Sequence, residues 1–274
     1  MPSVAMMNPK NISMKKLSPL FASVALLTLV GAGCGSTPAP ANDQTSQTTP
    51  SQKAPKPGAA MSNCDTPYFP VRKGHSISYQ STIAGKKVSY SSTITDATKD
   101  SATLEYEFGA GSASTSKITV QMTCADGHLR ALGQADFSSL LGQNTQFTSE
   151  TKNTSGDLLP KDLAVGSEWS GSFESEATIN NPQMIKMGMG KMEIASDLTH
   201  KAVAEEQVTV PAGTYTAIKV ETTTKITTTM SANAKPAMTT TQTTEWWVKD
   251  VGLVKTVAGS GTSQYTTEAV SVTN

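Results

Sequence analysis

Apolar and polar residues alternate along most of the chain after residue 64. In one such stretch, residues 117–124, the apolar positions are Ile118, Val120, Met122 and Cys124. Successive side chains of a strand point to opposite faces, so a period of two is typical of half-buried antiparallel strands. Similar stretches recur between turn-forming Gly, Asp and Ser residues and predict about ten to twelve strands. The one helical candidate is the short run 135–141, which has Asp136 near its start.

A weak internal repeat divides these predicted strands into two sets. Pro70 is followed by Gly74, and Pro160 is followed by Gly166, in each case just before an apolar residue that begins a strand. Two similar halves would curl into one barrel, which leaves few exposed strand edges. Two unrelated Pro–Gly turns are the plain alternative. The predicted fold class is all-β: a single antiparallel barrel or a strongly curved sheet, with two similar halves as one arrangement.

The N-terminal region has the pattern of a bacterial lipoprotein signal. A positive stretch at Lys15 and Lys16 precedes an apolar run over residues 17–30. This run is too short to span a bilayer core of about 30 Å as a stable helix, which favours a cleaved signal peptide over residues 1–33. Small residues precede Cys34, the predicted lipidation site, although Gly31 stands where Leu is usual. Ordinary cleavage and a retained anchor are the alternatives.

The region after Cys34 predicts a tether and a location. Residues 35–63 consist mainly of Thr, Pro, Ser, Gln, Ala and Gly, a composition that cannot bury enough surface to offset its ordering entropy. Residues 34–63 are therefore predicted to be a disordered tether, and residues 64–274 a single β domain. Gly35 differs from the Asp that often marks inner-membrane retention. The expected location is the outer membrane in an organism with two membranes, and otherwise the outer face of the cell membrane.

Cysteine usage agrees with an exported protein. The chain has three cysteines, and if Cys34 carries lipid, only Cys64 and Cys124 remain to pair. An oxidising envelope permits that disulfide, while two buried free thiols are the alternative.

Composition and motifs argue against several classes of function. Lys plus Arg and Asp plus Glu each number 22, and no basic cluster stands out, so nucleic acid is not an expected partner. The histidines His75, His128 and His200 lie in different segments and predict no metal site. Serine-nucleophile motifs are also missing, so neither an enzyme nor a cofactor is predicted.

Two other groups of residues are candidates for binding. The first is a methionine cluster, whose thioethers could bind Cu(I) or simply pack: Met184, Met187, Met189 and Met192. The second is the pair Trp246 and Trp247, which must face opposite sides of a strand. The outward Trp is a candidate ligand platform beside Thr-rich strands, and packing beneath a loop is the alternative.

Several of these segments resemble one known group of proteins. The matching segments are Tyr68–Pro70 with Gly74, Val210–Tyr215 and Trp246–Lys255. Together they resemble a TapB-like family of uncharacterised bacterial lipoproteins, over roughly residues 64–274. The resemblance implies an antiparallel β-barrel-like fold on the cell envelope and supplies no catalytic residues. Ile77 stands where an aromatic residue is common in that family.

These observations favour a non-catalytic envelope lipoprotein, attached to the membrane through Cys34, whose β domain binds a ligand or an envelope protein or serves structurally. One alternative is a carrier or chaperone that holds an apolar molecule in a half-open barrel. A hydrolase without a recognisable motif is the third hypothesis. An apolar cavity would support the carrier, converging titratable groups the enzyme, and a filled barrel the binding or structural role.

Overall fold

The computed structural model describes residues 62–83, 85–109, 115–125, 128–136, 146–188, 190–230, 235–259 and 264–273. The predicted signal peptide, Cys34 and the predicted tether up to residue 61 lie outside this part of the chain. Within it, no helix has the length and apolar character needed to cross a membrane.

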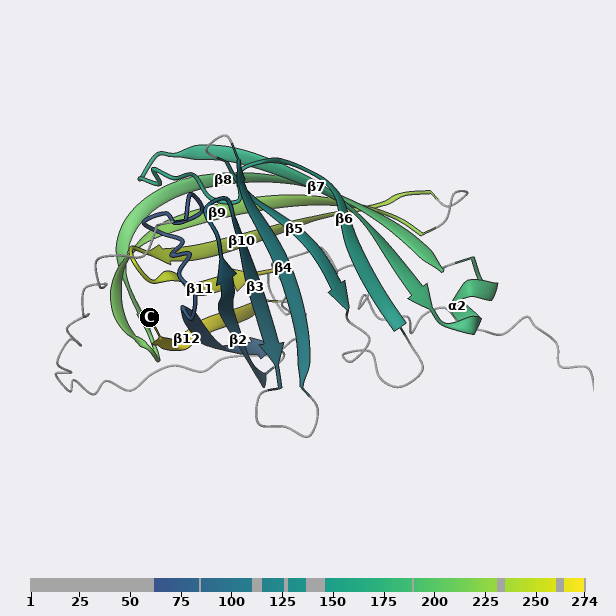
Figure 1. Cartoon of the computed structure of the whole chain (residues 1–274), viewed down its shortest axis with the longest axis horizontal. Helices are drawn as coiled ribbons and strands as arrows, with labels where there is room; N and C mark the ends of the chain where they lie inside the picture. Colours follow the sequence, from purple (N-terminus) through teal and green to yellow (C-terminus); the bar gives the residue numbers. More distant parts are fainter. Residues whose placement is uncertain are drawn as a thin grey trace, which may run out of the picture.

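Twelve antiparallel strands form a closed ring, which confirms the predicted all-β barrel (Figure 1). The strands are β1 (Ser76–Ile83), β2 (Lys86–Ala97), β3 (Ser101–Phe108), β4 (Ser116–Ala125), β5 (His128–Asp136), β6 (Gln146–Gly156), β7 (Glu168–Asn180), β8 (Lys191–Val210), β9 (Gly213–Thr229), β10 (Ala237–Val248), β11 (Gly252–Ala258) and β12 (Tyr265–Thr273). Neighbours along the chain pair with each other, and the ring closes because β1 pairs with both β2 and β12. A short helix, α2 (Pro182–Lys186), lies between β7 and β8 and is capped by the side chain of Asn181.

The predicted helix over residues 135–141 is wrong at its start. Ala135 and Asp136 belong to β5, where they pair with Ser149 and Thr148 of β6. Residues 137–141 lie outside the described residues. Pairing with β6 overrides the local helical preference of this short segment.

Burial follows the period of two read from the sequence. The β4 residues Ile118, Val120 and Met122 are all buried and belong to the largest core cluster, which also contains Ile94 of β2 and Leu104 of β3. Their neighbours on the opposite face point outward. The inward residues of β2, β3 and β4 lie opposite one another in the register, so this cluster is continuous across the three strands.

The predicted repeat is present as a pair of matching turns. Gly74 and Gly166 both adopt a φ of +91°, in the left-handed region that favours glycine. Gly74 N donates to Ile94 O at 2.8 Å, and Gly166 N donates to Ala202 O at the same distance. A β-bulge follows Ile94 in β2 and Ala202 in β8. Each turn leads into the first strand of a six-strand half, β1 or β7, so the two halves share their opening geometry.

One seam of the barrel is thinly paired. In the described residues, β5 and β6 pair through only three positions, Gln134 to Asp136 of β5. Beyond them, Leu158 N donates to Leu129 O at 2.9 Å and ties the two segments together again. The ring is therefore continuous but weakly closed between β5 and β6.

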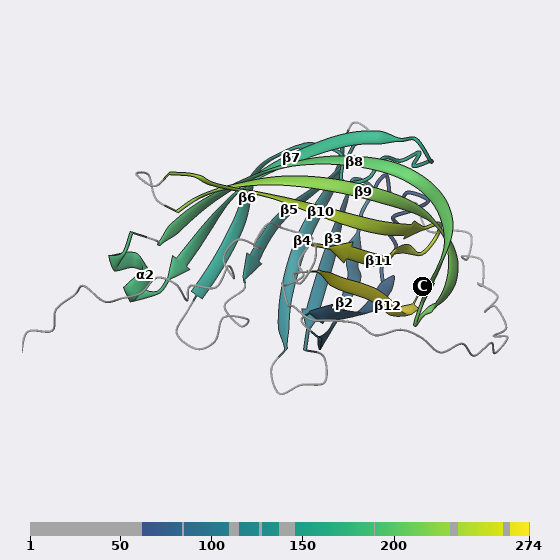
Figure 2. The same ribbon diagram turned by 180° about the vertical axis from the view of Figure 1, so that it is seen from behind.

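The β8–β9 hairpin is much longer than the other hairpins and bends around one end of the barrel (Figures 1 and 2). Its tip reaches β12, where Ala212 N donates to Ala269 O at 3.0 Å. Val208 and Val210 of this hairpin are buried against Val248, Val251 and Val254. The hairpin therefore adds a second layer over the wall made by β10–β12.

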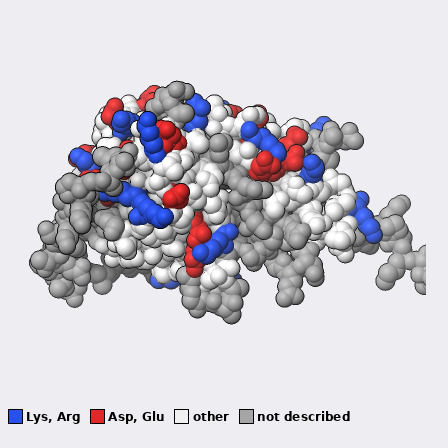
Figure 3. Space-filling view, in the orientation of Figure 1, with Lys and Arg blue, Asp and Glu red and all other residues white. Residues whose placement is uncertain are grey.

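Charged residues of both signs are interspersed over the face seen in Figure 3. Cross-strand ion pairs occur among the charged residues of the strands, such as Lys117 with Glu105 at 2.7 Å and Lys201 with Glu168 at 2.7 Å. Exposed pairs of this kind contribute little to stability. The two signs are mixed over the described part of the face in Figure 3, in keeping with the zero net charge of the chain.

Candidate functional site: the interior cavity

The barrel encloses a cavity of about 230 Å³. Its walls are mainly aliphatic and aromatic side chains contributed by β1–β4, β7, β10 and β11. They include Tyr79, Tyr90, Tyr106, Phe108, Phe173 and Trp247. Concave sites lined by apolar and aromatic groups, with a few polar groups among them, are the usual form of a small-molecule site.

Cross-strand pairing places several of the aromatic rings in contact. Tyr79 of β1 is directly opposite Tyr90 of β2, and Tyr90 is directly opposite Phe108 of β3. The ring centroids of these stacked pairs are 5.0 Å and 5.2 Å apart. The Tyr106 ring lies 6.3 Å from that of Tyr90 in a tilted arrangement. Strand register alone therefore produces an aromatic wall on β1–β3, which we call the aromatic wall (Tyr79, Tyr90, Tyr106 and Phe108).

Several of these inward-facing rings remain only half-buried. Tyr90, Tyr106, Phe108 and Phe173 keep accessible surface although they face the inside of the barrel and line the cavity. A filled barrel would bury such large rings, because protein interiors are close-packed. The accessible surface therefore faces free space inside the barrel.

The carboxyl group of Glu245, on β10, faces this cavity. Trp247 Nε1 donates a hydrogen bond to Glu245 Oε2 at 3.1 Å. Burial raises the pKa of Glu245 from its ordinary value of 4.5 to about 7, and the bond from Trp247 only partly offsets that rise. Burial also raises the pKa of Tyr79, Tyr106 and Tyr265, so these phenols are neutral when Glu245 titrates.

A segment before β1 covers one end of the cavity, and we call residues 62–75 the cap segment. Phe69 and Pro70 of this segment line the cavity. The Phe69 ring lies 6.4 Å from that of Trp247. The cap segment is therefore part of the site as well as its cover.

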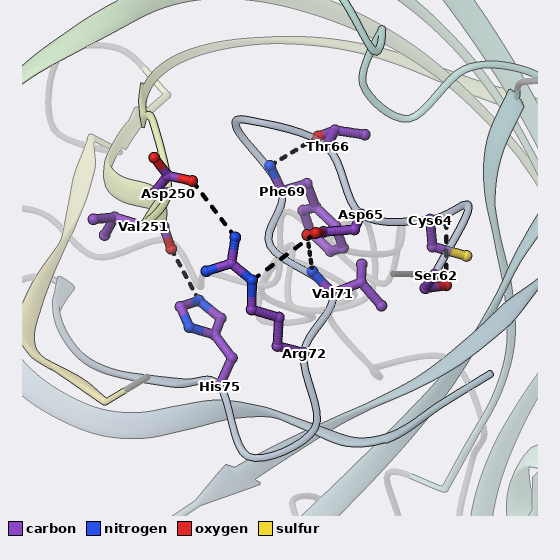
Figure 4. Close-up of polar contacts among 10 residues, drawn as sticks. All are labelled: Ser62, Cys64, Asp65, Thr66, Phe69, Val71, Arg72, His75, Asp250 and Val251. Carbon is purple, nitrogen blue, oxygen red and sulfur yellow. Dashed lines mark hydrogen bonds and ion pairs between the residues drawn. The ribbon is translucent and has the colours of Figure 1, made fainter. Parts of the chain in front are cut away.

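Polar contacts hold the cap segment in place (Figure 4). Asp65 accepts a hydrogen bond from Val71 N at 2.9 Å, and Arg72 lies within ion-pair distance of both Asp65 and Asp250. His75 Nε2 lies 3.0 Å from Val251 O. These contacts connect the cap segment to the turn between β10 and β11.

A covalent bond connects the cap segment to the opposite wall. Cys64 and Cys124 form a disulfide with a Cα–Cα distance of 5.1 Å, the pairing that the sequence favoured. Asn63 N donates to Lys99 O at 2.6 Å, which adds a backbone contact to the β2–β3 turn. The cap segment is thus fixed to β4, to the β2–β3 turn and to the β10–β11 turn.

The structure separates the two predicted platform tryptophans. Trp247 is buried and lines the cavity. Trp246 faces outward, where its Nε1 donates to Glu206 Oε1 at 2.7 Å. The ammonium groups of Lys219 and Lys255 lie 5.6 Å and 5.8 Å from its ring centroid. Trp246 is therefore engaged by its own surface neighbours, and the side chain that can contact a ligand in the cavity is Trp247.

The described methionine and histidine candidates form no metal site, and the side chain of His128 lies outside the described residues. Met192 is 1% exposed whereas Met187 is 60% exposed, and Met189 lies outside the described residues. His200 stacks on Trp169 with ring centroids 4.8 Å apart, and burial lowers the pKa of His200 to about 4. In the described part of the chain, no three His, Cys, Asp or Glu side chains come together as metal ligands.

Sequence reasoning missed Glu245, although a signal was available. Thr243, Glu245 and Trp247 share one parity along β10, so a buried Trp247 places Glu245 on the inner face as well. An ionisable residue on the apolar face of a predicted strand is a reason to expect a site.

The fold and the cavity together define a β-barrel protein that encloses an apolar internal site. The chain belongs to the DUF3108-like family, whose model matches residues 76–260.

The solved structures that match this chain share little sequence with it. A Bacteroides fragilis protein, described as exported and YmcC-like in fold, has 15% identity and a TM-score of 0.46, covering 77% of this chain and 100% of that one. A Parabacteroides distasonis protein described as a lipoprotein has 18% identity and a TM-score of 0.44, covering 76% and 99%. The lipoprotein YmcC of Escherichia coli, described as hypothetical, has 10% identity and a TM-score of 0.35, covering 73% and 85%. A comparison with curated protein sequences gives no match.

Proposed function

We propose that this protein is a lipid-anchored envelope protein whose barrel binds one apolar molecule in its interior. The observation that carries this proposal is the half-buried aromatic surface facing a cavity of about 230 Å³. Apolar cavities of about 150 Å³ stay dry and take up small apolar molecules. The cavity therefore favours the carrier hypothesis over a filled structural barrel.

The size of the cavity limits the ligand. Small-molecule sites usually measure about 300–1,000 Å³, and this cavity lies just below that range. One small apolar molecule, or part of one alkyl chain, suits the space better than a lipid with several chains.

The polar groups of the site support binding rather than catalysis. Glu245 accepts a hydrogen bond from the Trp247 indole, which offers a donor and no nucleophile. The aromatic wall beside it supplies rings that can contact apolar surface. We therefore assign Glu245 to positioning of a ligand, and the protein to a non-catalytic class.

A cavity-filling variant tests the proposal. Ser92 lines the cavity, whereas Ser91, its neighbour on β2, points to the other face. Ser92→Phe should reduce binding of the uncharged fluorophore N-phenyl-1-naphthylamine to the full-length protein by about tenfold or more, and Ser91→Phe should leave binding unchanged. Equal binding by both variants, or no binding by the wild-type protein, would contradict an interior site.

The anchor is tested separately. The TapB-like resemblance and the signal sequence both support lipidation at Cys34, with the outer membrane as the destination where two membranes exist. Cys34→Ala should abolish palmitate labelling and either release the protein from the membrane or leave an uncleaved precursor. Continued labelling of this variant would exclude Cys34 as the lipid site.

A further inference from the structure

The cavity extends to the barrel wall at the thin seam between β5 and β6. Its lining includes Arg130 of β5 and residues 154–156 of β6. These residues lie between the three paired positions at Gln134–Asp136 and the Leu158–Leu129 hydrogen bond. Over this interval the described residues of β5 and β6 form no ladder pair, so no paired backbone closes the wall beside the cavity there.

Two buried polar atoms at this seam have no hydrogen-bond partner among the described residues. They are Arg130 Nε and Ser149 Oγ. Both residues line the cavity, one from each strand of the seam, and Ser149 is 2% exposed. A buried donor without a partner is destabilising, so such atoms mark a place where a bound group or a water completes the pairing.

The charged side chains that line the cavity favour one orientation of a bound molecule. The Arg130 guanidinium carries a positive charge and lies at the seam. Glu245 lies on β10, beside the aromatic wall, where an anionic group would be repelled by the ionised carboxylate. Asp157 also lines the cavity near the seam and is already engaged in a contact of its own. An anionic group is therefore favoured near Arg130, and an apolar chain is favoured along the aromatic wall.

We propose that the ligand of this cavity is a single-chain anionic amphiphile, with its carboxylate or phosphate head at Arg130 in the β5–β6 seam and its chain against the aromatic wall. This inference rests on the proposed function and adds the chemical class and the orientation of the ligand. A guanidinium pairs with carboxylate or phosphate through charge-assisted hydrogen bonds, which are stronger than neutral ones. The seam is also the place where a chain can pass between strands without breaking ladder hydrogen bonds.

Displacement of N-phenyl-1-naphthylamine from the full-length protein tests the proposal. The competitors are dodecanoate, dodecyl phosphate and dodecanol, which share one chain length and differ in the head group. Both anions should displace the dye at concentrations at least about tenfold lower than dodecanol does. Arg130→Met should remove this preference and leave displacement by dodecanol unchanged. Lys117→Met is the matched control, because Lys117 is a cation whose side chain is exposed on β4 and does not line the cavity.

The outcomes separate this inference from the proposed function. Equal displacement by the anions and dodecanol, or a preference for the anions that survives Arg130→Met, would overturn the anionic ligand while leaving an apolar site intact. Failure of all three compounds to displace the dye would overturn the site itself.

If Arg130→Met does not fold, the variant Arg130→Lys is used instead, together with a cationic competitor, dodecyltrimethylammonium. Displacement by this cation as effective as that by dodecanoate would refute the role of Arg130. A difference between the two anions would identify the head group, carboxylate or phosphate.

Discussion

Replacement of Glu245 by Gln should make the barrel more stable at neutral pH, and the gain should disappear in acid. The structure places this carboxyl inside the barrel, where burial raises its pKa from 4.5 to about 7. Gln has nearly the same shape, stays neutral at every pH, and still offers an oxygen to the Trp247 indole. The substitution therefore removes the charge while keeping the packing.

The size and sign of this effect come from proton linkage. Between pH 4.5 and about pH 7 the folded protein binds more protons at Glu245 than the unfolded chain does, so the folded state loses stability as the pH rises. One pKa unit corresponds to about 1.4 kcal/mol. The difference in unfolding free energy between E245Q and wild type should therefore be near zero at about pH 4, grow through this window, and level off at about 3 kcal/mol above about pH 7.

Urea unfolding followed by tryptophan fluorescence measures this difference at a series of pH values. Equal dependence on urea in both proteins is the control, because it shows that the same surface is exposed on unfolding. A difference that does not change with pH would refute the reasoning. A wild-type protein that gains stability over E245Q as the pH rises would show that the folded barrel favours the carboxylate.

Three further changes test the packing. Met192→Ala should lower the unfolding free energy by about 2–5 kcal/mol, because Met192 is 1% exposed; Met187→Ala, at a position 60% exposed, should change it by less than about 0.5 kcal/mol. Equal effects in urea unfolding would contradict the different burial of the two methionines. Gly156→Ala should lower the melting temperature more than Gly85→Ala does, although the two φ angles are +72° and +73°. The reason is that a Cβ at Gly156 meets Ser170 O, whereas no described atom lies within 4 Å of a Cβ at Gly85. Calorimetric melting temperatures in the opposite order would exclude this contact. The double change Cys64→Ala and Cys124→Ala opens a loop with a sequence separation of 60 and should cost about 4 kcal/mol in the chain-entropy model. A double variant as stable as the oxidised wild type would rule that contribution out.

The sequence was sufficient for the strands and their faces, because the side-chain period of two is local and burial follows it directly. Ile118, Val120 and Met122 show this in β4. Closure of the ring was harder to predict from the sequence. It depends on Ser76 pairing with Thr273, and no local pattern indicates contacts between residues so far apart in the chain. The wrong helix prediction at Ala135 has the same origin, because pairing with β6 determines that this segment is a strand.

The candidate site was only partly predictable. Parity alone places Trp246 and Trp247 on opposite faces, and the structure shows which one faces inward. The role proposed for Arg130 could not be predicted from the sequence, because it depends on the sparse pairing between β5 and β6 beside this residue. The hollow interior also depends on how many strands close the ring, and the strand count was predicted only within a range.

The disulfide between Cys64 and Cys124 determines how mechanical force would travel through the molecule. Tension applied to the chain before Cys64 passes through the sulfur atoms directly into β4, at the point where that strand ends. The cap segment after Cys64 and strands β1–β3 lie within the covalent loop and carry none of that load. Tension arriving from the predicted tether would therefore bypass residues 65–75 of the cap segment, and the barrel would stay covered at this end.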